Sequence, residues 1–195
     1  MKILSMLPSF VFSFLFLQVN AQNEVPKGFS RGNLVLSDST VVTGFIKDNI
    51  SKDASVTFLN TVTEKKIKYN GDQLISAELD ANRFICIKGD FFKIVCKGEL
   101  CFLQKSSDAS GRPTYNGTEA LFMNGTPGKP GDYFIYDSKF KELKLVSNKT
   151  FASVTAATFA GCAAAIEKAK AVQGNIALLS EAVEIYNNNA AGTSR

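Results

Sequence analysis

Short apolar runs separated by turn residues fill most of this chain, from Asn33 to Val146. Within the runs apolar and polar residues tend to alternate, which is typical of β-strands. No helix-length connector separates them, as a parallel sheet would require. The pattern therefore predicts an α+β fold that begins with an antiparallel β-meander or small barrel-like sheet, over about residues 33–146. The expected strands are residues 33–36, 40–47, 55–59, 65–69, 73–79, 83–88, 91–97, 100–104, 133–136 and 141–146.

After Ser147 the composition changes to Ala, Lys and Glu, and apolar residues recur at helical intervals of three and four. Gly161 and the pair Gly174 and Asn175 interrupt this spacing. The pattern predicts an antiparallel helical hairpin over residues 148–188, packed on the sheet, and a flexible tail over 189–195. A free coiled-coil or partner-binding arm is the alternative. The apolar faces consist of Phe151, Val154, Thr158, Cys162 and Ile166, then Ile176, Leu179, Val183 and Tyr186.

Residues 1–21 are organised like a cleavable secretory signal peptide. Lys2 precedes an apolar stretch, and small residues end the segment before an expected cleavage site between Ala21 and Gln22. An uncleaved anchor is the alternative. We therefore expect an exported protein, in the periplasm or at the cell surface. Its β domain would span residues 22–147, with no transmembrane segment after cleavage.

The absence of His excludes much catalytic chemistry, including the Ser/His/Asp triad and His-ligated zinc. The net charge is +4, but the basic residues are dispersed, so nothing indicates binding to nucleic acid. Ser138 and Lys141 match a Ser-x-x-Lys pattern, but the companion motifs of serine acyltransferases are missing. No catalytic, cofactor-binding or metal-binding residue is predicted, no cofactor is expected, and the sequence favours a protein that is not an enzyme.

Four Cys residues in an exported chain indicate disulfide bonds. Cys96 and Cys101 flank a predicted two-residue turn, which would place them opposite each other on neighbouring strands. A Cys96–Cys101 bridge is the first prediction, and Cys86–Cys162 is the possible second pair. The alternative is that these residues are buried thiols. Their spacing matches neither a zinc motif nor a Cys-x-x-Cys redox motif.

The least regular stretch is the long loop over residues 106–132, which is rich in Gly, Pro, Asn and Thr. Loops of this length in a compact domain are often functional or else disordered. One interpretation is a binding surface that carries Tyr115, Phe122 and Met123. The other is a mobile insertion whose apolar island, residues 120–123, adds an edge strand.

Four features stand out along the chain: the strand pair over 31–47, the hairpin at 97–100, the helical segment 159–162 and the closing Tyr186 and Asn187. In these features the chain resembles a group of uncharacterised exported proteins of Bacteroidetes that share a domain of unknown function. The chain departs from that group at Gly161 and Ala163, where such proteins often have Asp and Pro. The resemblance implies periplasmic or surface residence in a bacterium and implies little about activity.

The leading hypothesis is an exported cell-envelope protein that serves as a non-enzymatic binding or scaffold module. Its partner is unidentified and could be an envelope protein or a glycan. The alternative is an extracytoplasmic carboxylate-dependent hydrolase or transferase, since such chemistry needs no His. Its mark would be two acids in one pocket. A third possibility is a redox-linked protein in which Cys86 and Cys162 act.

Overall fold

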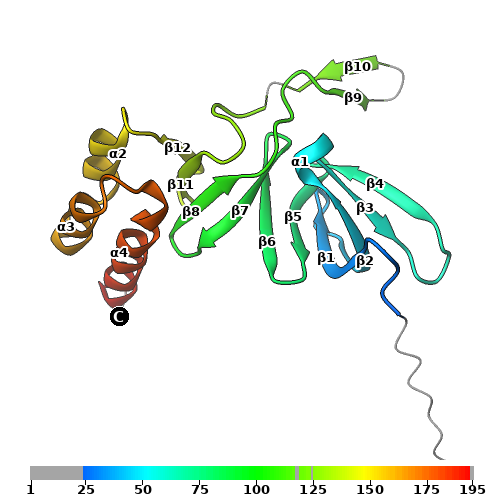
Figure 1. Ribbon diagram of the computed structural model, residues 1–195, viewed down its shortest axis with the longest axis horizontal. Coiled ribbons are helices and arrows are strands. Elements are labelled where there is room, and N and C mark those ends of the chain that lie inside the picture. The colour runs from blue at the N-terminus through cyan, green and yellow to red at the C-terminus, as the bar shows by residue number, and fades with distance from the viewer. Residues whose placement is uncertain (1–23, 117–118, 124, 194–195) are drawn as a thin grey trace, which may run out of the picture.

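The structure is a computed structural model, and it describes residues 24–116, 119–123 and 125–193. The expected signal peptide and its cleavage site at Ala21 and Gln22 lie outside these residues. The described chain forms a ten-stranded antiparallel sheet followed by helices, which confirms the predicted α+β class. Figure 1 shows the helices α2, α3 and α4 gathered at one end of the sheet.

The main sheet has the strand order β12-β11-β8-β7-β6-β5-β1-β2-β3-β4. Its neighbours pair antiparallel throughout. Strands that follow one another in the chain are mostly adjacent in space, so short turns connect them, as the sequence predicts. The strands are β1 Ser30–Leu36, β2 Val41–Asn49, β3 Ser55–Leu59, β4 Lys66–Asn70, β5 Leu74–Leu79, β6 Asn82–Ile87, β7 Asp90–Cys96, β8 Leu100–Lys105, β11 Tyr133–Asp137 and β12 Glu142–Val146.

The first six strands curl into a barrel-like half, which Figure 1 shows at the opposite end of the molecule from the helices. Their inward side chains form one apolar core, in which Leu34, Ile46 and Val56 are completely buried. A short helix, α1 (Ile50–Asp53), follows β2 directly, and the sequence analysis missed it. Gly71 and Gly89 form a β-bridge near the same end. A Cβ atom on Gly71 would overlap the Gly89 carbonyl oxygen, so glycine is required for this approach.

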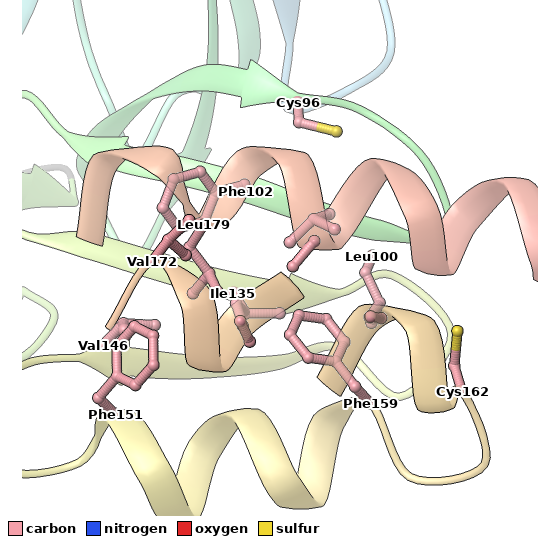
Figure 2. Close-up of a cluster of buried hydrophobic side chains, with 14 residues drawn as sticks. Cys96, Leu100, Phe102, Ile135, Val146, Phe151, Phe159, Cys162, Val172 and Leu179 are labelled. Atoms are coloured by element: carbon pink, nitrogen blue, oxygen red, sulfur yellow. The ribbon is translucent and has the colours of Figure 1, made fainter. Parts of the chain in front are cut away.

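The second half of the sheet has buried side chains on both of its faces. Because successive side chains point to opposite faces, Phe102 on β8 lies on one face and Leu103 on the other. The helices cover the face that carries Phe102 and Ile135, as Figure 2 shows. On the other face, a Cβ on Gly128 would lie 3.1 Å from Phe134 Cζ. The long loop therefore contributes to the second cover.

The helical cover consists of α2 (Phe151–Thr158), α3 (Ala163–Ala171), the 3-10 turn η1 (Ile176–Leu178) and α4 (Leu179–Thr193). Gly161 has a left-handed backbone (φ +85°) and separates α2 from α3, at the break that the spacing predicts. Asn187 attaches α4 to the sheet: its Nδ2 donates to the Leu100 carbonyl at 2.9 Å, and its Oδ1 accepts from the Leu100 N–H at 3.0 Å. The predicted tail over 189–195 differs from the structure, since α4 continues to Thr193.

No helix among the described residues combines the length and the apolar character needed to cross a membrane.

Candidate functional site

The long loop between β8 and β11, residues 106–132, is called the insertion below. It contains β9 (Pro113–Asn116) and β10 (Glu119–Phe122), which pair only with each other as a two-stranded sheet. The apolar island at 120–123 therefore does form a strand, but this strand does not join the edge of the main sheet. Figure 1 shows the β9–β10 hairpin projecting beyond the ends of the main strands.

A buried ion pair lies at the base of the insertion. Asp90 begins β7 and Lys105 ends β8, and the Lys105 Nζ atom is 3.1 Å from Asp90 Oδ2. Both side chains are 0% exposed. Removing two charges from water costs several kcal/mol per ion unless good geometry and further hydrogen bonds compensate. Further hydrogen bonds to the two charged groups are therefore needed to offset the cost of burying them.

Those partners belong to the insertion, on both sides of the β9–β10 hairpin. The Asp90 carboxylate accepts hydrogen bonds from Ala109 N at 2.7 Å, Thr126 N at 2.7 Å and Thr126 Oγ1 at 2.6 Å. The Lys105 ammonium donates to the carbonyl oxygens of Thr126 at 2.7 Å and Gly128 at 3.0 Å. Together with Asp90, these acceptors occupy all three donors of the ammonium. The ion pair thus fixes both arms of the insertion.

Other hydrogen bonds secure the first arm. Ser106 N donates to the Phe91 carbonyl at 2.8 Å, and Ser107 Oγ accepts from Phe91 N at 2.8 Å. The Arg112 guanidinium joins the arm to α1, because its Nη2 donates to the Lys52 carbonyl at 3.0 Å. The base of the hairpin is therefore tied to β7 and to α1.

The predicted binding-loop residues fall in different surroundings. Phe122, at the end of β10, is 70% exposed. Met123 is partly buried and lies over Gly89, where a Cβ would overlap its Cε atom. Tyr115 lies in β9 opposite Ala120, and its side chain is outside the described part of the structure. The sequence left two alternatives, a binding surface and a mobile insertion. The hydrogen bonds that join the insertion to Asp90, Lys105 and α1 favour a fixed insertion.

Two hollows flank Met123. The first, called the α1 hollow, has a volume of about 280 Å³. It contains an ion pair between Asp53 Oδ2 and Lys68 Nζ at 2.6 Å. Partial burial acts to raise the pKa of Asp53, but hydrogen bonds from Lys68 and Ser55 outweigh it and hold the pKa below its usual value. The lining consists of Asp53, Ala54, Lys68, Asn70, Ala109, Arg112, Pro113 and Met123.

The second hollow, called the Gly89 hollow, has a volume of about 460 Å³ and lies beside the β6–β7 turn. Cys86 is part of its lining. Burial raises the pKa of this thiol, and the charges of Asp72 and Asp90 raise it further. The thiol therefore stays protonated, which makes it a poor nucleophile. The lining consists of Gly71, Asp72, Leu74, Cys86, Lys88, Gly89, Met123 and Gly125.

A third hollow, called the C-terminal groove, lies between β11, β12 and the helices and has a volume of about 290 Å³. Asp137 and Glu142 are directly opposite each other on the two strands, and both line it. Asp137 Oδ1 accepts from the backbone N–H groups of Lys139 at 2.9 Å and Phe140 at 3.0 Å. Glu142 pairs with Lys144 at 3.0 Å. Asp137 therefore supports the turn of its own hairpin, whereas Glu142 forms an ion pair along β12.

The predicted disulfides are wrong, because all four cysteines are free thiols. A β-bulge between Ile94 and Cys96 shifts the register, so that Cys96 pairs with Phe102. Cys96 then joins the helix-covered core, whereas Cys101 joins the core on the opposite face of the sheet. Cys86 packs against the barrel-like core, and Cys162 belongs to the helix-covered core, so they do not meet either. Figure 2 shows the Cys96 and Cys162 sulfur atoms on separate elements.

Sequence analysis missed Asp90 and Lys105, which organise the insertion. Asp90 was assigned to a turn with Gly89, and Lys105 directly follows an expected strand. The available signal was a charge at the end of a mostly apolar run, with Asp90 next to Phe91 and Lys105 two residues after Leu103. Such charges are nearly always solvated at strand ends, so the sequence alone did not separate this pair from the others.

Comparison with known proteins gives no further guidance: no family model, curated protein or solved structure matches the chain. Within the described ranges, Cys, Asp and Glu side chains nowhere gather in a group of three that could hold a metal ion. A fold alone does not determine a function, so the function is argued from the sites themselves.

Proposed function

We propose that this chain is an exported cell-envelope protein that acts as a non-enzymatic binding module, with the insertion as its ligand-contacting surface. The observation that carries the proposal is the buried Asp90–Lys105 pair with its five hydrogen bonds to the insertion. Apolar residues would cover the sheet at lower cost, whereas buried polar groups can select one conformation. A loop that only connects two strands does not need to be held in one conformation.

A fixed insertion favours binding because the loop is already ordered before the ligand arrives. Ordering a loop or side chain on binding costs affinity, and preorganisation removes that cost. The hairpin also presents Phe122 to solvent at 70% exposure, and aromatic side chains are frequent anchors of binding surfaces. The two hollows beside Met123 extend this surface towards α1 and the β6–β7 turn.

Envelope residence is part of the proposal. It is supported by the signal-peptide organisation of residues 1–21 and by the resemblance to exported Bacteroidetes proteins. The expected partner is an envelope protein or glycan. Expression in a bacterium, followed by N-terminal sequencing of the exported product, should give a chain that begins at Gln22. A product that keeps residues 1–21 and stays in the cytoplasm would contradict this part.

The binding surface is tested by exchanging exposed apolar residues. Phe122→Ser should weaken cosedimentation with envelope polysaccharide and envelope vesicles by about tenfold, because it removes an aromatic anchor. Val62→Ser is the control, since Val62 is 89% exposed in the β3–β4 turn and lines neither the hollows beside Met123 nor the C-terminal groove. Equal effects of the two substitutions, or no binding by the unmodified protein, would refute the proposal.

The second candidate is a carboxylate-dependent hydrolase or transferase at the C-terminal groove. It is favoured by one observation, the convergence of Asp137 and Glu142 on the same hollow. General acid–base catalysis would require at least one of these acids to exchange a proton with substrate. Hydrolysis of envelope glycans that is lost in Asp137→Asn and Glu142→Gln would establish this activity. Activity unchanged in both variants would remove the groove as a catalytic site.

A further inference from the structure

We infer that the α1 hollow is a subsite for one carboxylate-bearing sugar unit, a hexuronate. This inference rests on the proposed function and specifies its ligand. Three features of the hollow carry it: its size, a fixed guanidinium beside a lysine, and a lining that mixes acceptors with small apolar side chains.

The size of the hollow suits one sugar ring. Its volume is about 280 Å³, just below the range of about 300–1,000 Å³ that drug-sized ligands occupy. It lies where α1, the end of β4 and the first arm of the insertion meet. Because the hydrogen bonds described above hold that arm in place, the hollow exists before a ligand binds.

The charge of the hollow favours an anion. The lining holds two cations, Arg112 and Lys68, and one acid, Asp53, which pairs with Lys68. Asp108, outside the lining, also interacts with Arg112. The guanidinium is held from two sides, since Nε donates to the Asp108 carbonyl at 2.9 Å and Nη2 donates to the Lys52 carbonyl at 3.0 Å. A planar guanidinium that is already oriented is well matched to a carboxylate. A neutral sugar would offer this guanidinium no charged acceptor.

The remaining lining distinguishes a sugar from an acidic peptide. The Asp53 carboxylate and the Asn70 amide can accept hydrogen bonds from hydroxyl groups, and the amide can also donate. The apolar wall is formed by small or flexible side chains, which suit the C–H face of a pyranose ring. An acidic side chain of a peptide offers no hydroxyl donors, so it would leave Asp53 facing a second carboxylate. The apolar wall consists of Ala54, Ala109, Pro113 and Met123.

The test is an NMR titration of the exported protein with galacturonate oligomers, the galacturonate monomer, neutral galactose oligomers and poly-glutamate. Galacturonate should shift the amides of Ala54, Asn70 and Ala109, and binding should weaken as salt is raised. The monomer should shift the same amides more weakly than the oligomers. Neutral galactose should bind at least tenfold more weakly, because it lacks the carboxylate that would accept charge-assisted hydrogen bonds from Arg112.

Two substitutions and one control locate the effect. Lys68→Gln and Arg112→Gln should each weaken galacturonate binding, the latter by about tenfold, the usual value of a charged hydrogen bond. Lys68 is mostly exposed, so its substitution leaves the fold intact even if Arg112→Gln loosens the insertion. Arg83→Gln is the matched control, because Arg83 forms a comparable surface pair with Glu78 on β5 and β6. It should not change the affinity.

Each other outcome overturns the inference. Equal affinity for neutral galactose would show that the carboxylate is not recognised, and stronger shifts with poly-glutamate would identify an acidic peptide as the occupant. If galacturonate leaves the three amides unchanged while Phe122→Ser still weakens envelope binding, the inference fails and the proposed function stands. If the protein binds nothing in the envelope, both fail.

Discussion

The two covers of the second half of the sheet work by different physical means. The helices cover one face with apolar side chains such as Phe159, Leu179 and Val183, all completely buried. On the other face, the insertion is held by the hydrogen-bonded Asp90–Lys105 pair. The first cover draws on the hydrophobic effect, which is strong and non-directional. The second uses directional bonds that fit only one arrangement of the loop.

The two covers differ in how strictly they fix the conformation of the segment that forms them. A helical cover tolerates shifts and substitutions of similar volume. A buried ion pair contributes little net stability compared with apolar residues, but it strongly penalises any loop conformation that leaves a charge unpartnered. Rigidity of the insertion is thus the property that the structure maintains at a cost, and it is the basis of the binding function that we propose.

The largest expected effect comes from breaking the ion pair. Asp90→Ala leaves the Lys105 ammonium buried without its counter-charge and should lower the free energy of unfolding by about 3–5 kcal/mol. The double substitution Asp90→Leu and Lys105→Met should restore much of this stability, but it should leave the insertion mobile. Urea unfolding measures the first effect, and amide exchange of the insertion measures the second. A double variant with a rigid insertion would show that the pair is not what fixes it.

A substitution in the helical cover should lower the free energy of unfolding nearly as much as Asp90→Ala, but it should loosen the helices and not the insertion. Leu179→Ala removes a completely buried side chain and should lower the free energy of unfolding by about 3 kcal/mol. The amides of α3 and α4 should exchange faster than the loss of global stability explains. The amides of the insertion should exchange faster only to the extent that the global free energy of unfolding falls. Selective loss of protection in the insertion would mean that the two covers are not independent.

The position of Met123 depends on Gly89. Gly89→Ala would place a side chain at a left-handed backbone position (φ +84°) and against the Met123 side chain. We expect a loss of about 1–3 kcal/mol, the usual cost of such strain, and displacement of Met123 from between the two hollows. Urea unfolding and the Met123 methyl resonance would show these changes. An unchanged methyl resonance would contradict the placement of Met123.

The smallest effect concerns pH. The pKa of Asp53 in the folded protein lies below its usual value, so the ionised carboxylate stabilises the folded state. This stabilisation is complete at pH values above the unfolded pKa of about 4. It is lost as the pH falls through the folded pKa. Lys68→Gln removes one cause of the lowered pKa, so it should reduce the loss of stability between pH 7 and pH 3. Urea unfolding at the two pH values tests this. An undiminished loss would show that Lys68 does not stabilise the carboxylate.

The strands were predictable because their pattern is local. Every expected strand is present within a few residues, and the helical break falls at Gly161 as expected. The disulfide failed because a β-bulge between Ile94 and Cys96 changes which face Cys96 occupies, and nothing in the local sequence specifies that bulge. The ion pair was missed for a related reason. Whether Asp90 and Lys105 are buried depends on the second arm of the insertion, where Thr126 and Gly128 fold back over them.

The central claim is that the insertion is fixed by the buried pair before any ligand binds. Native-state hydrogen exchange of the amides of Ala109 and Thr126, which donate to the Asp90 carboxylate, tests it most directly. The account predicts that both amides exchange only through global unfolding, with the same protection as the core strand β8. Rapid exchange of these two amides in an otherwise protected protein would show a mobile insertion and would contradict the account.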